Sequence, residues 1–235
     1  MKIIKANNYT AFLVTLSLCI LLLNQIRAQQ YQPLPHSNAV WDMVWYKDPE
    51  GWIGDNPFLL HYKYRILKDS IIENKTYQVY YKTSYNTTCS FDSVVEPGVF
   101  FLRNDINSKR VYLLEGNEEK ELYNFNLNVG DTLNGILFSH HPDIHFTVNS
   151  IDSVIVVNKY HKRYVLYRDG YFFRDYLIEG VGYSWGLLEN APTGFYPFYE
   201  LRCFHNNNQL GYMNSFSGEC ALEVDTCLVA VFQPH

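Results

Sequence analysis

The sequence has no cluster of basic residues and a small excess of acidic ones. It holds 19 Lys and Arg against 24 Asp and Glu among 235 residues, which gives a formal net charge of -5. The densest basic run, His161-Lys162-Arg163, is short, and we expect it on a turn. Proteins that bind a nucleic-acid backbone present a basic surface, so nucleic acid is not an expected partner of this chain.

Long apolar runs and helical periodicity are also scarce. The main apolar run, residues 11–23, is shorter than the roughly 20 residues that span a bilayer. Nowhere do apolar residues recur at helical spacing over a long window. We therefore expect little helix outside this run and no transmembrane anchor in the mature chain.

The apolar run is part of an expected export signal. Lys2 and Lys5 precede it, and Ile26-Arg27-Ala28 follows it with a small residue at the end. These features are typical of a secretory signal peptide, so we predict that residues 1–28 are removed. Arg27 would also suit an uncleaved anchor, and Cys19 a lipoprotein, but Ala28 favours cleavage and Cys19 lacks a small residue before it. The mature protein is then periplasmic, cell-surface or secreted.

Cysteine is scarce too, with five residues in the chain and four after the signal. No C-x-x-C pair is present, so these thiols do not predict a zinc site. In an oxidising compartment an even number of cysteines predicts two disulfides, with three possible connectivities. Proximity in sequence favours Cys203 with Cys220, which leaves Cys89 for Cys227.

Aromatic residues are abundant, at 17% of the chain, and they favour strands. Residues 58–67 alternate between two faces, which is typical of a half-buried strand. One face holds Leu60, Tyr62, Tyr64 and Ile66, and the other holds His61, Lys63 and Arg65. Turn residues 73–75 then lead into a second alternating run, residues 76–81, so the two runs predict a hairpin.

Similar runs along the chain predict further strands. They lie at residues 99–103, 109–114, 145–150, 153–157, 163–167, 176–178, 198–204 and 210–213. We predict an all-β antiparallel fold, either a sandwich or an open barrel, with roughly ten or more short strands. The expected organisation is a signal peptide at residues 1–28, an aromatic-rich segment at residues 29–57 that packs on the core, and a single all-β domain at residues 58–235.

Three segments follow one another in the order of a recurring set of phrases. Residues 122–132 match LYDF-x-L-x-x-GDT, residues 178–188 match IEGIG-x-x-x-GLL, and residues 201–204 match L-x-CF. Residues 101–112 also match a REDxxxkVY strand pair, with Asn104 where the acid usually stands. Over about residues 60 to 215 the chain thus resembles an uncharacterised family of exported β-rich domains from Bacteroidota.

The resemblance implies export and a β-rich domain, and no activity. Many relatives continue into a sorting tail that the type IX secretion system reads. The chain ends eight residues after Cys227 without a tail of the Tyr-Pro-Asn-Pro type. The resemblance therefore leaves that route, the periplasm and other outward routes open.

The run Gly182-Tyr183-Ser184-Trp185-Gly186 matches the G-x-S-x-G nucleophile elbow of α/β-hydrolases. That motif needs a strand that turns into a helix, and then an acid and a His later in the chain. Residues 187–197 contain two prolines and a glycine, and the only His after Asp225 is His235. We predict a tight turn between strands and keep Ser184 as the candidate nucleophile of the alternative reading, a secreted hydrolase.

Asp131 and Glu179 are the carboxylates that could act as a general acid and base, since both lie in the matching phrases. Catalysis would require them to share a cleft. Asp131 stands in a turn and Glu179 at a strand end, where each could instead bond nearby backbone amides. We favour these structural roles for Asp131 and Glu179 over catalysis.

Two further groups are candidates for binding. Trp41, Trp45 and Trp52 lie near acidic residues, a combination that can hold a sugar by ring stacking and hydrogen bonds or can pack on the core. His140, His141 and His145 surround Pro142, which rules out a helical zinc site and leaves only a loop site. We predict no metal and no cofactor.

The sequence as a whole favours an exported, non-enzymatic binding or structural module of the cell envelope or extracellular space. Its ligand is unknown, with a glycan or a surface protein as candidate partners. The alternative is a secreted hydrolase whose site the sequence does not identify.

Overall fold

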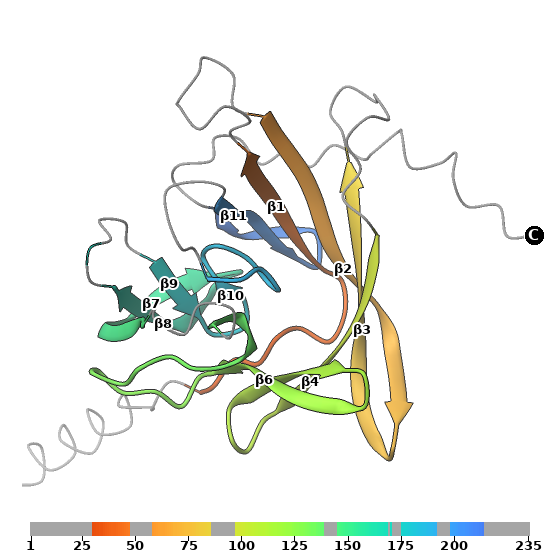
Figure 1. Ribbon diagram of the computed structural model, residues 1–235, viewed down its shortest axis with the longest axis horizontal. Helices are drawn as coiled ribbons and strands as arrows, with labels where there is room; N and C mark the ends of the chain where they lie inside the picture. The colour runs from red at the N-terminus through yellow and green to blue at the C-terminus, as the bar shows by residue number, and fades with distance from the viewer. Residues whose placement is uncertain are drawn as a thin grey trace, which may run out of the picture. The chain divides into compact units, whose positions relative to one another are not determined.

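The computed structural model describes residues 30–47, 58–85, 97–138, 145–168, 170, 175–191 and 198–213. The chain divides into residues 1–30 and a unit of residues 31–235. The described part of that unit forms an eight-stranded sheet, in the order β12-β11-β1-β2-β3-β4-β5-β6, and a four-stranded sheet, in the order β10-β9-β8-β7 (Figure 1). Neighbouring strands are antiparallel, so the predicted all-β antiparallel fold is confirmed.

The large sheet uses both ends of the described chain. Its strands are β1 (Ala39–Lys47), β2 (Phe58–Ile72), β3 (Lys75–Tyr85), β4 (Gly98–Asp105), β5 (Arg110–Glu115), β6 (Glu118–Asn124), β11 (Phe198–Asn206) and β12 (Gln209–Met213). The small sheet contains β7 (Thr147–Val156), β8 (Lys159–Tyr167), β9 (Asp175–Ile178) and β10 (Gly182–Tyr183), and one 3-10 turn, η1 (Ile136–Phe138), precedes it. Among the described residues, no helix is both long and apolar enough to cross a membrane.

Several strands differ from the predicted ones. β7 joins the two runs predicted at residues 145–150 and 153–157, and β6 was not predicted as a strand. Within the predicted N-terminal segment, residues 39–47 form β1, which pairs with β11 on one side and β2 on the other. The segment thus supplies an inner strand of the large sheet.

The basic run His161-Lys162-Arg163 lies in β8, so its prediction as a turn was wrong. The turn comes earlier, at Val157 and Asn158, whose φ angles are 44° and 63°. Both residues have the left-handed conformation that a two-residue hairpin turn requires. Lys159 then pairs with Val156, and the basic run continues the strand.

The core lies between the facing sides of the two sheets. Tyr62 and Tyr64 are each 1% exposed and point inward, as their alternation predicts. Buried tyrosines need a partner for the hydroxyl group. In this core Tyr123 donates to the carbonyl of Leu187, and Tyr164 donates to the carbonyl of Phe125.

Residues 31–38, which we call the strap, connect the two sheets before β1 begins. Leu34 is fully buried, and the Nδ2 of Asn104 on β4 donates to its carbonyl at 3.2 Å and to the Oε1 of Gln78 at 3.1 Å. At the small sheet, the amide of Gln32 lies 3.4 Å from the Oε2 of Glu179. Asn104 donates to both acceptors, which an ionised acid at this position could not do.

Candidate functional site

The three family-like segments meet in space and join the two sheets. We call this contact of residues 122–132, 178–188 and 201–204 the seam. Tyr123 of the first segment donates to the Leu187 carbonyl of the second. The amide of Leu201 in the third donates to the Ser184 carbonyl of the second at 2.8 Å. The phrases that are recognisable in the sequence therefore build the scaffold.

Glycines of the second segment leave room for polar side chains in the seam. Gly182 has a φ of 109°, and a Cβ on it would lie 2.7 Å from the hydroxyl oxygen of Tyr123. A Cβ on Gly186, whose φ is 143°, would overlap the Oε2 of Glu189. Both positions require glycine for conformation and for space.

Glu189 follows the second segment and holds a carboxylate inside the core. Its Oε1 accepts hydrogen bonds from the hydroxyls of Tyr62, at 2.9 Å, and Tyr64, at 2.6 Å. The amide of Leu188 donates to its Oε2 at 3.0 Å, and the Nζ of Lys82 lies 3.7 Å from Oε1. The residue is 5% exposed, so these donors replace the water that a carboxylate otherwise binds.

Aromatic rings surround this carboxylate and extend toward the protein surface. The Nζ of Lys82 lies 4.3 Å from the centroid of the Tyr62 ring, a cation–π contact. Trp45 on β1 stacks on its cross-strand partner Tyr199, with centroids 5.9 Å apart and an interplanar angle of 16°. Trp45, Tyr199 and Lys82 are half-buried. We call Glu189, Tyr62, Tyr64, Lys82, Trp45 and Tyr199 the Glu189 cluster.

Three tyrosines near Glu189 stay protonated because they are buried and because the Glu189 carboxylate is negatively charged. Burial raises the pKa of Tyr62 and Tyr64 well above the usual value, and the charge of Glu189 raises both further. Burial and then Glu189 also raise the pKa of Tyr199. All three hydroxyls therefore remain hydrogen-bond donors across the physiological pH range.

A second carboxylate, Glu119 on β6, lies among cations on the other face of the large sheet. Arg103 donates to both of its oxygens, at 2.5 Å and 2.9 Å, and Lys75 and Tyr77 each donate at 2.8 Å. The hydrogen bonds from Arg103 are the main cause that lowers the pKa of Glu119 to about 2. We call these four residues the Glu119 network.

Ser184 is buried in the seam and is bonded to strand β9. Its Oγ accepts from the amide of Tyr176 at 3.0 Å and donates to the Oδ1 of Asp175 at 3.2 Å. Burial raises the pKa of Asp175 to about 6. The described residues after Ser184, up to residue 191, form turns and a bridge in place of the helix of a nucleophile elbow.

Glu179 and Asp131 have separate partners from Ser184. Glu179 is 1% exposed; its carboxylate accepts from the amide of Gln32, and its carbonyl accepts from the Nδ1 of His161 at 2.6 Å. Burial raises the pKa of Glu179. The Oδ2 of Asp131 accepts from the amide of Asn128 at 2.8 Å in its own turn. Each of the two carboxylates bonds nearby backbone.

The tryptophans and histidines that the sequence offered as binding residues lie in different environments. Trp41 is fully buried, and its Nε1 donates to the carbonyl of Val181 at 2.7 Å. Trp45 belongs to the half-buried stack described above, and His145 is exposed. Trp52, His140 and His141 lie outside the described residues. Within the described residues, no group of three or more His, Cys, Asp or Glu is placed to hold a metal.

Only one predicted disulfide cysteine is among the described residues. Cys203 is fully buried and disulfide-bonded. Cys89, Cys220 and Cys227 lie outside the described residues, so the pairing stays a prediction.

Sequence reasoning did not single out Glu189 or Lys82. The inward face of residues 58–67 was predicted correctly, and it already contained Tyr62 and Tyr64. A glutamate directly after an apolar, glycine-rich phrase was the available signal for a buried carboxylate. The hydrogen bonds of Glu189 to Tyr64 and Tyr62 span 125 and 127 positions of sequence, respectively. No local pattern indicates contacts of such long range.

Comparison of the chain with protein-family models, curated proteins and solved structures finds no match. The resemblance to the exported family of Bacteroidota therefore stays a prediction from the phrases.

Proposed function

We propose that the chain is an exported, non-catalytic binding module of the cell envelope or extracellular space, and that its ligand is a glycan. The ligand contacts lie at the half-buried side of the Glu189 cluster, where Trp45 and Tyr199 stack. The export part of the proposal depends on the signal expected in residues 1–28, which lie outside the described residues.

The bonding of the candidate catalytic groups supports a non-catalytic role. A nucleophile needs a base that takes its proton, and a general acid or base has to exchange a proton with the substrate. Ser184 is only 6% exposed and its Oγ accepts from the amide of Tyr176, and Glu179 and Asp131 also accept from backbone amides. These side chains hold the scaffold together.

The stack of Trp45 on Tyr199 is the observation that carries the glycan proposal. Aromatic rings offer an apolar face to the C–H groups of a sugar, and adjacent polar groups fix its orientation. The hydroxyl of Tyr199 supplies such a group at the stack, and Glu189, whose charge acts on that hydroxyl, has the amine of Lys82 3.7 Å from its Oε1.

A glycan array probed with residues 29–235 tests the proposal. We expect binding to one class of saccharide, and at least about a tenfold loss of affinity for that saccharide in Tyr199→Ala, because the stack loses one ring. The affinity of each variant is measured by calorimetry after circular dichroism has shown the wild-type fold.

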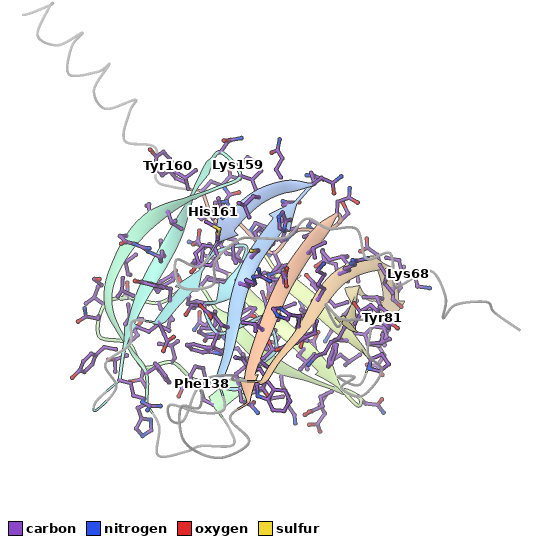
Figure 2. The ribbon with its side chains drawn as sticks, turned by 90° about the horizontal axis from the view of Figure 1, so that it is seen from above. Lys68, Tyr81, Phe138, Lys159, Tyr160 and His161 are labelled. Carbon is purple, nitrogen blue, oxygen red and sulfur yellow. The ribbon has the colours of Figure 1, made fainter. Side chains whose placement is uncertain are left out.

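Tyr160→Ala is the matched control. Tyr160 is 65% exposed and lies at the β7–β8 hairpin, on the opposite side of the molecule from Lys68 and Tyr81 in Figure 2. Its replacement should leave the affinity unchanged. A folded protein that binds nothing on a broad array contradicts the proposal, and cleavage of a bound glycan supports the hydrolase instead.

A further inference from the structure

The sequence contains one Asn-Gly pair, Asn134-Gly135, and it lies in irregular backbone. The pair follows the bridge of Thr132 with Thr147 and directly precedes the 3-10 turn η1. The side-chain amide of an asparagine can be attacked by the backbone nitrogen of the next residue. A glycine at that next position favours the attack, because it has no Cβ to obstruct the approach and its backbone is flexible.

The fold does not protect the two reacting groups. Asn134 is exposed, and its Nδ2 donates to the carbonyl of Thr132 over 3.4 Å, which is long for a hydrogen bond. In the described part of the chain, neither a strand ladder nor a turn hydrogen bond uses the amide of Gly135. The attack therefore breaks no backbone hydrogen bond of the folded protein.

The reaction is a ring closure followed by hydrolysis. A base in the solvent removes the proton from the nitrogen of Gly135, and this nitrogen bonds to Cγ of Asn134. The bond from Cγ to Nδ2 breaks, and ammonia leaves after taking a proton from water. Water then adds to either carbonyl carbon of the resulting succinimide and opens the ring. The products are aspartate and isoaspartate, and the main chain of isoaspartate is one methylene longer.

A longer main chain at this point affects η1, because Gly135 lies close against β6. A Cβ on Gly135, whose φ is 124°, would lie 2.8 Å from the carbonyl oxygen of Glu121. The carbonyl of Gly135 accepts from the amide of Phe138 at 3.2 Å. The carbonyl of Leu137 accepts from the amide of Ala191 at 3.0 Å. A shift of Gly135 thus disturbs both bonds that hold η1.

The end of η1 packs on rings of the seam. Phe138 is 7% exposed, and its labelled position is seen in Figure 2. Its ring makes edge-on contacts with Tyr183, at 5.8 Å between centroids, and with Trp185, at 6.2 Å. Displacement of η1 weakens these contacts, whereas an aspartate in place of Asn134 adds only a charge at an exposed position.

We infer that Asn134-Gly135 is a site of spontaneous deamidation in the folded protein, and that the isoaspartate product loosens η1 from the seam. Water is the only co-reactant. Each conversion adds one negative charge, so the formal net charge of the chain changes from -5 to -5 − 1 = -6. The charge and the stability of the protein therefore change irreversibly as it ages.

Peptide mapping of aged protein is the first test, with Asn128 as the matched control. Trypsin releases both asparagines in one peptide, residues 121–159, and fragmentation in the mass spectrometer locates the new acid. Asn128 is also exposed, but Val129 follows it. We expect Asn134 to convert at least about tenfold faster than Asn128 at mildly alkaline pH, because the branched side chain of valine hinders the attack. Equal rates overturn the inference.

The same conversion is then measured in urea, where the chain is unfolded. Since the amide of Gly135 is not held in a ladder, the rate in the folded protein should lie within about tenfold of the rate in urea. Stronger protection by the fold overturns the inference.

The third test compares the aged protein with Asn134→Asp, which has the added charge and the normal main chain. Chromatography separates the aged forms, and peptide mapping identifies the isoaspartyl one. We expect Asn134→Asp to melt within about 1 °C of the wild type and the isoaspartyl form to melt at least about 2 °C lower. An isoaspartyl form that melts with Asn134→Asp overturns the loosening of η1.

Discussion

Two carboxylates, Glu189 and Glu119, lie in contrasting environments, and they have four and three partner residues respectively. Glu189 is 5% exposed and bonds mainly neutral donors from distant parts of the chain. The side chain of Glu119 is 16% exposed and bonds two cations and a tyrosine close to solvent. The partners of Glu119 can return to water if the bond is lost, whereas the donors around Glu189 cannot. The comparison indicates that the buried Glu189 carboxylate contributes more to the stability of the fold and that the Glu119 network adds a smaller, charge-dependent contribution.

The largest expected effect is the loss of the Glu189 carboxylate. Glu189→Ala leaves two tyrosine hydroxyls, one amide and Lys82 without their acceptor inside the core. Removing one partner of a buried polar group typically costs about 3–5 kcal/mol. The free energy of unfolding of residues 29–235 in urea, followed by tryptophan fluorescence, measures this loss.

Two variants make the comparison sharper. Glu189→Gln keeps one oxygen that can accept hydrogen bonds. Its free energy of unfolding should therefore fall by less, about 2 kcal/mol. Glu119→Ala should cost only about 1 kcal/mol, because solvent screens its cations. Equal losses of stability for Glu189→Ala and Glu119→Ala would show that burial does not make the Glu189 carboxylate the more important of the two.

The next largest effect concerns the space that glycine leaves in the seam. Gly182→Ala places a Cβ 2.7 Å from the Tyr123 hydroxyl oxygen at a φ of 109°. Steric overlap adds to backbone strain, so we expect a loss of about 2–3 kcal/mol. Gly116→Ala is the control, because its φ is also positive, at 62°, and nothing lies within 4 Å of the added Cβ.

The control should be destabilised only by the strain of an alanine in the left-handed conformation, about 1 kcal/mol. Thermal unfolding followed by circular dichroism compares the two variants. A Gly182→Ala protein as stable as Gly116→Ala would mean that Tyr123 can move away at no cost.

Local patterns were enough for the fold class and for most strands. Alternation in residues 58–67 correctly predicted that Tyr62 and Tyr64 point inward, because a strand places every second side chain on the same face. The turn at residues 105–108 was also recognisable, since the Asp105 carboxylate accepts from the amides of Asn107 and Ser108. Such features depend on neighbours in the sequence.

The Glu189 cluster and the burial of Lys63 depend on tertiary contacts, which explains why the sequence did not predict them. Lys63 has the alternation of a solvated residue, yet it is 7% exposed. β1 was not predicted as a strand, although it joins β11 to β2 across more than 150 residues of sequence. Strand order places these residues together, and strand order is not encoded in any one strand.

The smallest expected effects are two opposite pH dependences, each about 1 kcal/mol after allowance for solvent screening. The pKa of Glu119 is lowered from 4.5 to about 2, so its contribution to stability is present above pH 4.5 and is lost as the pH falls toward 2. The pKa of Asp175 is raised from 3.8 to about 6, so its contribution is present below pH 3.8 and is lost as the pH rises through 6.

The variants Glu119→Gln and Asp175→Asn separate the two contributions. Relative to the wild type, Glu119→Gln should be least stable at pH 7, and its deficit should shrink toward pH 3, because the carboxylate of the unfolded wild-type chain then binds a proton that the folded chain does not bind. Asp175→Asn should gain on the wild type between pH 4 and pH 7, because only the wild type has to bury a charge there. Urea unfolding of all three proteins at pH 3, 5 and 7 measures both differences. Differences that stay constant with pH would mean that folding shifts neither pKa, which contradicts the contrast between a buried carboxylate and one in a charge network near solvent.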